Sequence, residues 1–165
     1  MSTSIRVGIG FDVHAFAEGD FIILAGVRIP HERGVRAHSD GDVVIHALCD
    51  ALLGAAGLGD IGMHFPDSDP QWRGAAGAVL LERVLAMLLA RGFEPVNVDV
   101  TILAERPRIA PHREAMRRRL AEMLELPPEV VNIKATTTEQ LGLIGRGEGL
   151  AAQAIALVES LARDG

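Results

Sequence analysis

The order in which strand-like and helix-like segments alternate is the feature that most restricts the fold of this chain. Residues 5–14 have the pattern of a strand, and residues 93–103 carry valine or isoleucine at alternate positions, as a half-buried strand does. Between them, residues 75–90 repeat apolar side chains on one face of a helix that ends at Gly92. This alternation predicts an α/β fold in which helices cover a sheet.

Shorter segments extend the pattern. Two apolar runs within residues 21–29 predict a hairpin, residues 43–53 a helix, residues 112–126 a charged amphipathic helix and residues 130–135 a further strand. Residues 150–161 are ambiguous, because their alanine content favours a helix while their continuous apolar run permits a buried strand.

Glycines, prolines and aspartates interrupt the pattern between the predicted helices 43–53 and 75–90. Four glycines between residues 53 and 62 predict a helix end followed by a mobile loop. The prolines and aspartates of residues 65–70 indicate that this loop continues without regular structure.

Chain length and composition bound the class of protein. With 165 residues, 48% of them hydrophobic, the chain is long enough for one well-packed domain, and we expect that single domain to span residues 1–165. No apolar run approaches the roughly 18 residues of a membrane span, and residues 1–6 lack the apolar core of a signal peptide. Cys49 is the only cysteine, which excludes an internal disulfide and fits a reducing compartment. We therefore expect a cytoplasmic protein without a membrane partner.

The net charge of −6 argues against a general nucleic-acid-binding protein. Of the 16 cationic residues only Lys134 is a lysine, and one alanine separates it from a run of three threonines and Glu139. Threonines at a strand end are common in β-edges. Three hydroxyls with one ammonium and one carboxylate also suit a phosphate and a hard cation, and Arg146 follows between glycines.

The best candidate for a metal site combines two segments. Residues 38–50 concentrate histidine, aspartate and cysteine around the start of a predicted helix, on which His46 lies. Asp12 and His14 are two apart in a predicted strand, so their side chains leave the same face. Three nitrogen and oxygen ligands with a fourth position open are typical of a catalytic zinc site. The alternative is that each histidine is an ordinary hydrogen-bonded surface or core residue.

The residues near His46 in the sequence have roles that their spacing predicts. Asp50 stands four residues later on the same helix face, which predicts that its carboxylate orients the His46 ring as a second-shell partner; otherwise Asp50 only faces solvent. Asp40 or Asp42 is suited to cap the helix. Cys49 is interpreted as a small buried apolar residue.

Six motifs together resemble one known family. They are Gly-Phe-Asp-Val-His at 10–14, His-Ser-Asp-Gly-Asp at 38–42, His46, Leu-Gly-Asp-Ile-Gly at 58–62, Phe-Pro-Asp at 65–67 and Lys-Ala-Thr-Thr-Thr-Glu at 134–139. Their order and spacing are similar to those of the 2-C-methyl-D-erythritol 2,4-cyclodiphosphate synthase family over nearly the whole chain.

The resemblance implies a homotrimer of α/β subunits, each with a mixed sheet of four to five strands covered by helices on one side, and active sites between neighbouring subunits. It implies conversion of 4-diphosphocytidyl-2-C-methyl-D-erythritol 2-phosphate to the 2,4-cyclodiphosphate. In this reaction the 2-phosphate attacks the β-phosphorus and CMP leaves. The step belongs to the non-mevalonate route to isoprenoids.

The resemblance also implies roles for individual residues. Asp12, His14 and His46 match zinc ligands, and Glu139 matches a contact to a second cation, Mg²⁺ or Mn²⁺. His38 and Thr137 match the positions that stabilise the transition state. Leu143 stands where the family is expected to carry phenylalanine, at the edge of a pocket near the threefold axis. The residues implied in substrate binding are Asp12, His14, His38, Ser39, Asp60, Ile61, Gly62, Phe65, Pro66, Asp67, Ser68, Asp69, Ala104, Glu105, Arg106, Pro107, Arg108, Ile109, Ala110, Thr136, Thr137, Thr138, Glu139, Leu143 and Arg146.

Two other classes of function stay open on the sequence. A metal-dependent phosphoesterase would use the same Asp-His-His set with an activated water and usually a second metal close by. A non-enzymatic trimer that binds isoprenoid diphosphates or proteins would need Arg146 and the threefold pocket and would be indifferent to zinc.

Overall fold

A computed structural model describes residues 4–161, so residues 1–3 and 162–165 of the expected domain lie outside the described residues. The main sheet has five strands in the order β4-β1-β7-β5-β6. Only β5 and β6 run parallel, and the other neighbours are antiparallel. The strands are β1 (Ile5–Ala17), β4 (Gly34–Val35), β5 (Phe93–Leu103), β6 (Val131–Thr136) and β7 (Gly149–Ser160). The prediction of a mixed α/β domain is confirmed.

The ambiguous segment at the end of the chain is strand β7, in the middle of the sheet. It pairs with β1 from Ile5↔Glu159 to Ala15↔Gly149 and with β5 on its other side. A strand paired on both edges has all its backbone groups satisfied, and this tertiary context outweighs the helix propensity of its alanines. The predicted hairpin is present as β2 (Phe21–Leu24) and β3 (Val27–Pro30), which form a separate two-stranded sheet.

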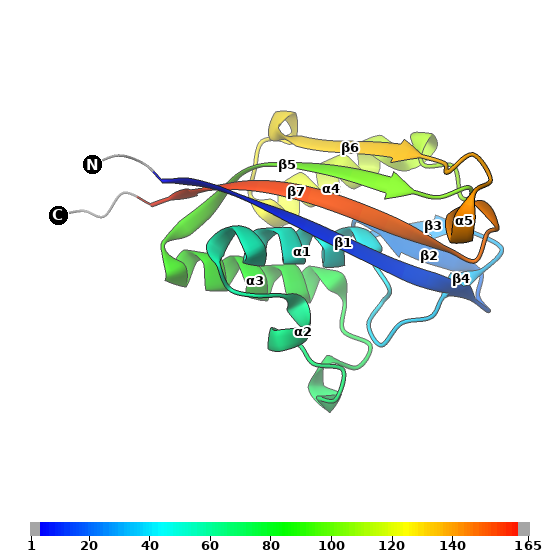
Figure 1. The fold of residues 1–165 in the computed structure, drawn as a ribbon, viewed down its shortest axis with the longest axis horizontal. Coiled ribbons are helices and arrows are strands. Elements are labelled where there is room, and N and C mark those ends of the chain that lie inside the picture. The colour runs from blue at the N-terminus through cyan, green and yellow to red at the C-terminus, as the bar shows by residue number, and fades with distance from the viewer. Residues whose placement is uncertain (1–3, 162–165) are drawn as a thin grey trace.

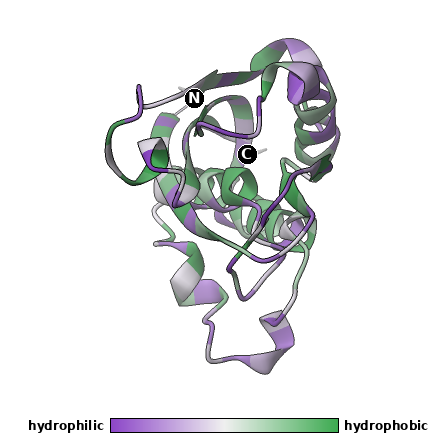
Figure 2. Ribbon diagram, turned by 90° about the vertical axis from the view of Figure 1, so that its right-hand side faces the viewer, coloured by the Kyte–Doolittle hydropathy of each residue, from purple (hydrophilic) through white to green (hydrophobic). Residues whose placement is uncertain are grey.

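Three long helices lie on one side of the main sheet: α1 (Val43–Ala56), α3 (Gly77–Arg91) and α4 (Arg113–Leu124) (Figure 1). Gly57 and Gly92 end α1 and α3 in the left-handed conformation. Hydrophobic colouring is concentrated on the helices in the middle of the molecule (Figure 2). Nearly all of α1 is buried, so it is the central element of the core.

Helix α1 packs unusually close to β1, because β1 has glycines where the helix crosses it. A Cβ atom at Gly10 would lie 1.8 Å from the carbonyl oxygen of Ala47, and one at Gly8 would lie 1.9 Å from that of Ala51. Any side chain at these positions would push the helix away from the strand. The two glycines therefore set the distance between β1 and α1.

The opposite face of β1 carries no helix. Its apolar side chains are largely exposed: Ile5 62%, Val7 66%, Ile9 61%, Phe11 56% and Val13 43%. In the same face, across the sheet, Lys134 and Asn132 of β6 contact Asp99 of β5. We call this surface the bare face; it is apolar on β1 and polar on β5 and β6.

The segment between α1 and α3 corrects one prediction. It contains the short helix α2 (Ile61–His64) and a 3-10 turn at Pro70–Trp72, where regular structure was not expected. Asp60 and Asp69 cap these turns by accepting N–H bonds from Met63 and Gln71. The same aspartates that favour loops are thus helix caps here. Both turns project from the body of the molecule (Figure 1).

Three further short helical turns are Ala110–His112, Pro128–Val130 and α5 (Gly142–Gly145). Within residues 4–161, no helix has both the length and the apolar character needed to cross a membrane.

Candidate metal centre and pocket

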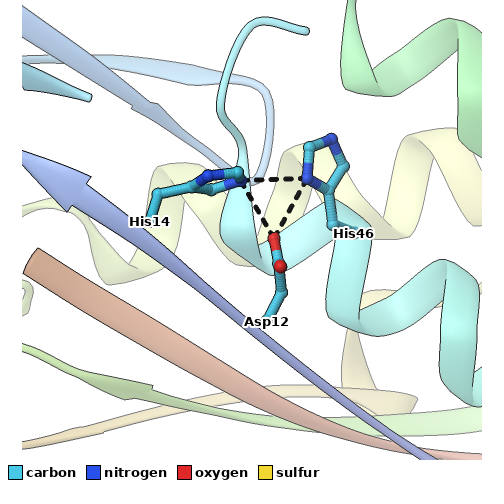
Figure 3. Close-up of side chains that lie close together, drawn as sticks. All are labelled: Asp12, His14 and His46. Carbon is cyan, nitrogen blue, oxygen red and sulfur yellow. Dashed lines mark hydrogen bonds and ion pairs between the residues drawn. The ribbon is translucent and has the colours of Figure 1, made fainter. Parts of the chain in front are cut away.

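Asp12, His14 and His46 converge on one point, as the sequence predicts (Figure 3). Asp12 and His14 leave the helix-covered face of β1, and His46 comes from the first turns of α1. Asp12 Oδ2 lies 3.0 Å from both His14 Nε2 and His46 Nδ1, and the two nitrogens are 3.2 Å apart. The three atoms form a nearly equilateral triangle.

The triangle fits a divalent metal. Three ligand atoms around a tetrahedral ion at bond lengths of about 2.0 Å lie about 3.3 Å from one another. Two imidazoles and one carboxylate are ligands that zinc and similar ions accept in catalytic sites. Among residues 4–161, this is the one group of histidine, cysteine and acidic side chains close enough to hold an ion together.

The charges of the triangle support the same reading. Burial disfavours the ionised form of Asp12, but hydrogen bonds with His14 and His46 outweigh burial and lower its pKa to about 2. Burial also disfavours charge on His46, yet the hydrogen bond with Asp12 raises the pKa of this imidazole overall. Asp12 is therefore ionised at neutral pH, and its negative charge favours a cation, a proton or a metal ion, beside both imidazoles.

The buried Asp42 holds His46 in place. The carboxylate of Asp42 accepts four backbone N–H bonds, two from the first turn of α1 and two from the β2–β3 turn. Asp42 therefore caps α1, and its carbonyl accepts the N–H of His46. Asp40 does not cap α1; its Oδ2 accepts the N–H of Gly77 and so ties the loop before α1 to the start of α3.

The predicted partner of His46 is wrong. His46 Nε2, the nitrogen that faces away from the triangle, contacts Ser39 Oγ at 3.0 Å, so both ring nitrogens have partners other than Asp50. Asp50 Oδ1 instead accepts the N–H of Ile61 at 2.8 Å, which fixes the start of α2. The i,i+4 spacing placed Asp50 on the correct side of the helix, but the ring of His46 points towards the helix N-terminus.

A cavity of about 780 Å³ opens over the triangle. It is lined by Asp12, His14, Arg36, Ala37, His38, Ser39, His46, Ile61, Gly62, Phe65, Pro66, Asp67, Trp72 and Leu80. Sequence reasoning missed Arg36, Ala37, Trp72 and Leu80. The only sequence signal for Arg36 was that it lies two residues before His38. Trp72 packs edge-to-face on Phe65, with 4.8 Å between the ring centroids.

Two residues of the cavity wall were predicted to act on substrate from the loops. His38 is 71% exposed, and its Nε2 lies 4.0 Å from Asp67 Oδ2 across the mouth of the cavity. The carbonyl of His38 accepts the N–H of Gly74, so the loop before α1 and the segment before α3 are joined.

The second group of predicted residues lies elsewhere. Residues 104–110 and 136–139 adjoin each other, because the Glu105 carboxylate accepts N–H bonds from Thr138 and from Gln140, the residue that follows the predicted group. The register Val13↔Ala151, Ala151↔Leu103 and Leu103↔Thr136 sets the end of β5, before residues 104–110, two strands from β1, and the end of β6 three strands from it. At the usual spacing of neighbouring strands these separations are about 10 Å and about 14 Å. Thr137 and Glu139 do not line the 780 Å³ cavity.

The three remaining candidates point in other directions. Lys134 is paired with Asp99 on the bare face, so its ammonium does not join the threonine run in a phosphate site. Leu143 is exposed on α5. Arg146 forms an exposed ion pair with Glu148 at 2.8 Å.

The fold and the triangle define a single α/β domain that places an Asp-His-His group able to hold a metal ion between strand β1 and helix α1. The YgbB family model matches residues 5–159, and the chain belongs to that family.

Similar proteins agree over nearly the whole chain. The 2-C-methyl-D-erythritol 2,4-cyclodiphosphate synthase of Thioalkalivibrio sulfidiphilus is 60% identical over 157 residues, 95% of this chain and 98% of the relative. The protein of that name from Pseudomonas putida is 59% identical over 154 residues, 93% of this chain and 98% of the relative.

Solved structures have the same fold. The bifunctional IspDF of Campylobacter jejuni superposes with a TM-score of 0.93 at 44% identity over 97% of this chain, which spans only 43% of that longer protein. A structure of 2C-methyl-D-erythritol-2,4-cyclodiphosphate synthase in its CDP-bound form has a TM-score of 0.86 at 39% identity, over 93% of this chain and 99% of that one.

Proposed function

We propose that this protein is a 2-C-methyl-D-erythritol 2,4-cyclodiphosphate synthase of the non-mevalonate isoprenoid route. It converts 4-diphosphocytidyl-2-C-methyl-D-erythritol 2-phosphate to the cyclic diphosphate and CMP. The observation that carries the proposal is the triangle of Asp12, His14 and His46 at the base of a 780 Å³ cavity. The chain that presents it is 60% identical to a synthase of that name.

The triangle holds Zn²⁺ in this proposal. When bound, the ion polarises a phosphate oxygen of the diphosphate and so favours attack at phosphorus. The substrate carries both nucleophile and leaving group, so the protein mainly folds one molecule into a reactive shape and stabilises charge. No nucleophilic side chain is needed for that chemistry.

The cavity wall positions the erythritol and its phosphates. His38 reaches the mouth of the cavity and stabilises charge in the transition state, while residues 60–62 and 65–69 hold the erythritol phosphate. Arg36 adds a permanent cation to the same wall, which suits a ligand with several phosphates.

The cytidine end belongs to the second group of residues. Residues 104–110 and 136–138 form the pocket for the base, Thr137 contacts the diphosphate during reaction, and Glu139 would hold Mg²⁺ or Mn²⁺, which would supply positive charge to the diphosphate. In one chain the ends of β5 and β6 that carry this group lie two and three strands from β1, about 10 Å and about 14 Å at the usual strand spacing. A site that uses both groups at close range therefore takes them from different subunits.

The assembly is proposed to be a homotrimer of domains that span residues 1–165. The bare face supports association, because five apolar side chains of β1 are 43–66% exposed in one row. Contiguous exposed apolar surface of this kind marks interaction sites. Polar groups on β5 and β6 of the same face offer a different surface to a neighbouring copy.

Phosphorus NMR with the cytidyl substrate tests the proposal, with and without a chelator. We expect CMP and the cyclic diphosphate, and loss of both signals when the metal is removed. Inorganic phosphate as the product would instead indicate a phosphoesterase. A folded assembly that binds diphosphates but gives no product in zinc would indicate a non-enzymatic protein.

A further inference from the structure

Ser39 contacts a proposed metal ligand and the cavity at once. It lies in the loop before α1, half-buried, and lines the 780 Å³ cavity. Its Oγ is 3.0 Å from His46 Nε2 and accepts the backbone N–H of Gly41 at 3.2 Å. Within residues 4–161, these are the hydrogen-bond contacts of the hydroxyl.

The direction of each bond follows from which groups can donate. The Gly41 N–H can only donate, so it takes one of the two acceptor positions of the Ser39 oxygen. His46 turns Nδ1 towards Asp12 and His14, so Nδ1 supplies the lone pair for an ion in the triangle. A neutral imidazole that ligates through Nδ1 carries its proton on Nε2. His46 Nε2–H then donates to Ser39 and takes the second acceptor position.

The hydroxyl proton of Ser39 is left without a protein acceptor in that state. Both lone pairs of Oγ are used, and a serine hydroxyl has one proton to donate. The remaining direction is the cavity that Ser39 lines, where Arg36 and His38 also favour an anion. An anionic oxygen of a ligand in the cavity can accept this proton and so complete the hydrogen bonds of the Ser39 hydroxyl.

We propose that Ser39 is a positioning residue that couples the metal ligand His46 to an anionic phosphate oxygen in the cavity. This inference rests on the proposed function and adds a physical link to it. Hydrogen bonds in a chain polarise one another, so a phosphate that accepts from Ser39 strengthens the bond from His46. Metal and phosphate ligand therefore raise each other's affinity, by the same factor in both directions.

Zinc affinity and CDP affinity, each measured with and without the other, test the coupling. Zinc is titrated in competition with a chelator, and CDP is titrated by calorimetry. Ser39→Ala should weaken zinc binding about 10-fold, the lower end of the usual effect of removing a hydrogen-bond partner from a metal-bound histidine. It should also reduce, several-fold, the factor by which zinc increases the affinity for CDP. Ser39→Thr keeps the hydroxyl and should restore most of both effects.

Ser160→Ala is the matched control. Its hydroxyl also accepts one backbone N–H, from Ser4 at 2.9 Å, but at the far end of β7. It should leave zinc affinity and coupling unchanged. A Ser39→Ala protein that is less stable but keeps the wild-type coupling factor would show a merely structural role and overturn the inference.

Nitrogen NMR of the histidines in the zinc-loaded wild-type protein tests the same inference without a variant. We expect His46 Nδ1 to be the ligating nitrogen and Nε2 to carry the proton. Ligation through Nε2 would refute the proposed role of Ser39 while leaving the synthase activity intact. Failure of the proposed function would look different, because the wild-type protein would then form no cyclic product in zinc.

Discussion

The two faces of strand β1 differ sharply, although they belong to the same thirteen residues. The helix-covered face presents Gly8, Gly10, Asp12 and His14 to α1, and its packing is so close that glycine is required. The bare face presents five large apolar side chains to solvent. One face is covered within a single chain, and the other is exposed in it.

This contrast separates what one subunit does from what the proposed homotrimer would do. The metal triangle needs only β1 and α1, since its three ligand atoms already lie within 3.2 Å of one another. Residues 104–110 and 136–140 lie at the other edge of the sheet and do not reach the cavity. Metal binding should therefore survive loss of assembly, whereas turnover should not.

The largest expected effect comes from the covered face. His46→Ala removes one corner of the triangle and, with it, several kcal/mol of charge stabilisation in the transition state. At 1.36 kcal/mol per factor of ten, turnover should fall by about 10³-fold or more. Phosphorus NMR measures product, and metal analysis of the purified variant measures zinc. Turnover near the wild-type rate in a zinc-free variant would show that the triangle is not the catalytic centre.

A substitution on the bare face should abolish turnover without emptying the triangle. Phe11→Asp puts a carboxylate in the proposed interface, where burial of an unpaired charge costs several kcal/mol, so association should weaken by roughly 100-fold or more. Analytical ultracentrifugation measures the assembly. Leu89→Asp is the control, because Leu89 is 62% exposed on α3, away from the bare face. A monomeric wild-type protein with full activity would contradict the inter-subunit site.

Sequence reasoning succeeded where periodicity and ligand chemistry agreed. Asp12 and His14 on one strand face and His46 on a helix were enough to predict the triangle. The bare face escaped prediction from periodicity, because alternation shows that β1 has two kinds of face without showing what covers each. Strand β7 stayed ambiguous because only pairing on both edges decides between strand and helix for an alanine-rich segment.

The errors concern direction and distance rather than residue type. Asp50 has the right spacing from His46, but spacing says nothing of which nitrogen faces which neighbour, and Ser39 takes the position instead. Lys134 follows the same rule: its place before the threonines suggested a phosphate site, yet strand alternation turns it to the bare face beside Asp99.

Close packing on the covered face gives a prediction about stability. Gly10→Ala forces β1 and α1 apart, because the new Cβ would lie 1.8 Å from the carbonyl oxygen of Ala47. Overpacking of a rigid core costs about 3 kcal/mol, and the triangle should widen and lose zinc affinity. Gly54→Ala, in helix α1, is the matched control. Nothing lies within 4 Å of its new Cβ, so it should stabilise α1 by up to about 1 kcal/mol. Urea unfolding of the two variants measures both changes.

The smallest expected effect concerns the charge of Asp12 in metal-free protein. Because its pKa in the folded state is about 2, below the ordinary 3.8, ionised Asp12 stabilises the folded state above about pH 4. That contribution is lost as the pH falls through 2. His46, whose pKa is raised above 6.5, stays protonated over this interval and adds no slope. The difference in free energy of unfolding between the wild-type protein and Asp12→Asn should therefore shrink by up to about 2 kcal/mol as the pH falls from 4 to 2.

Asp99 on the bare face sharpens the comparison. Burial acts to raise its pKa, but the hydrogen bond with Lys134 prevails and lowers it, as the histidines do for Asp12. Its side chain is 36% exposed, against 25% for Asp12, so water screens the pair more effectively. The test replaces each aspartate separately in the Phe11→Asp chain, where the bare face stays in water. Asp99→Asn should change the pH dependence of the free energy of unfolding less than Asp12→Asn does. Equal slopes of unfolding free energy against pH would mean that burial on the helix-covered face does not strengthen the ion pairs there.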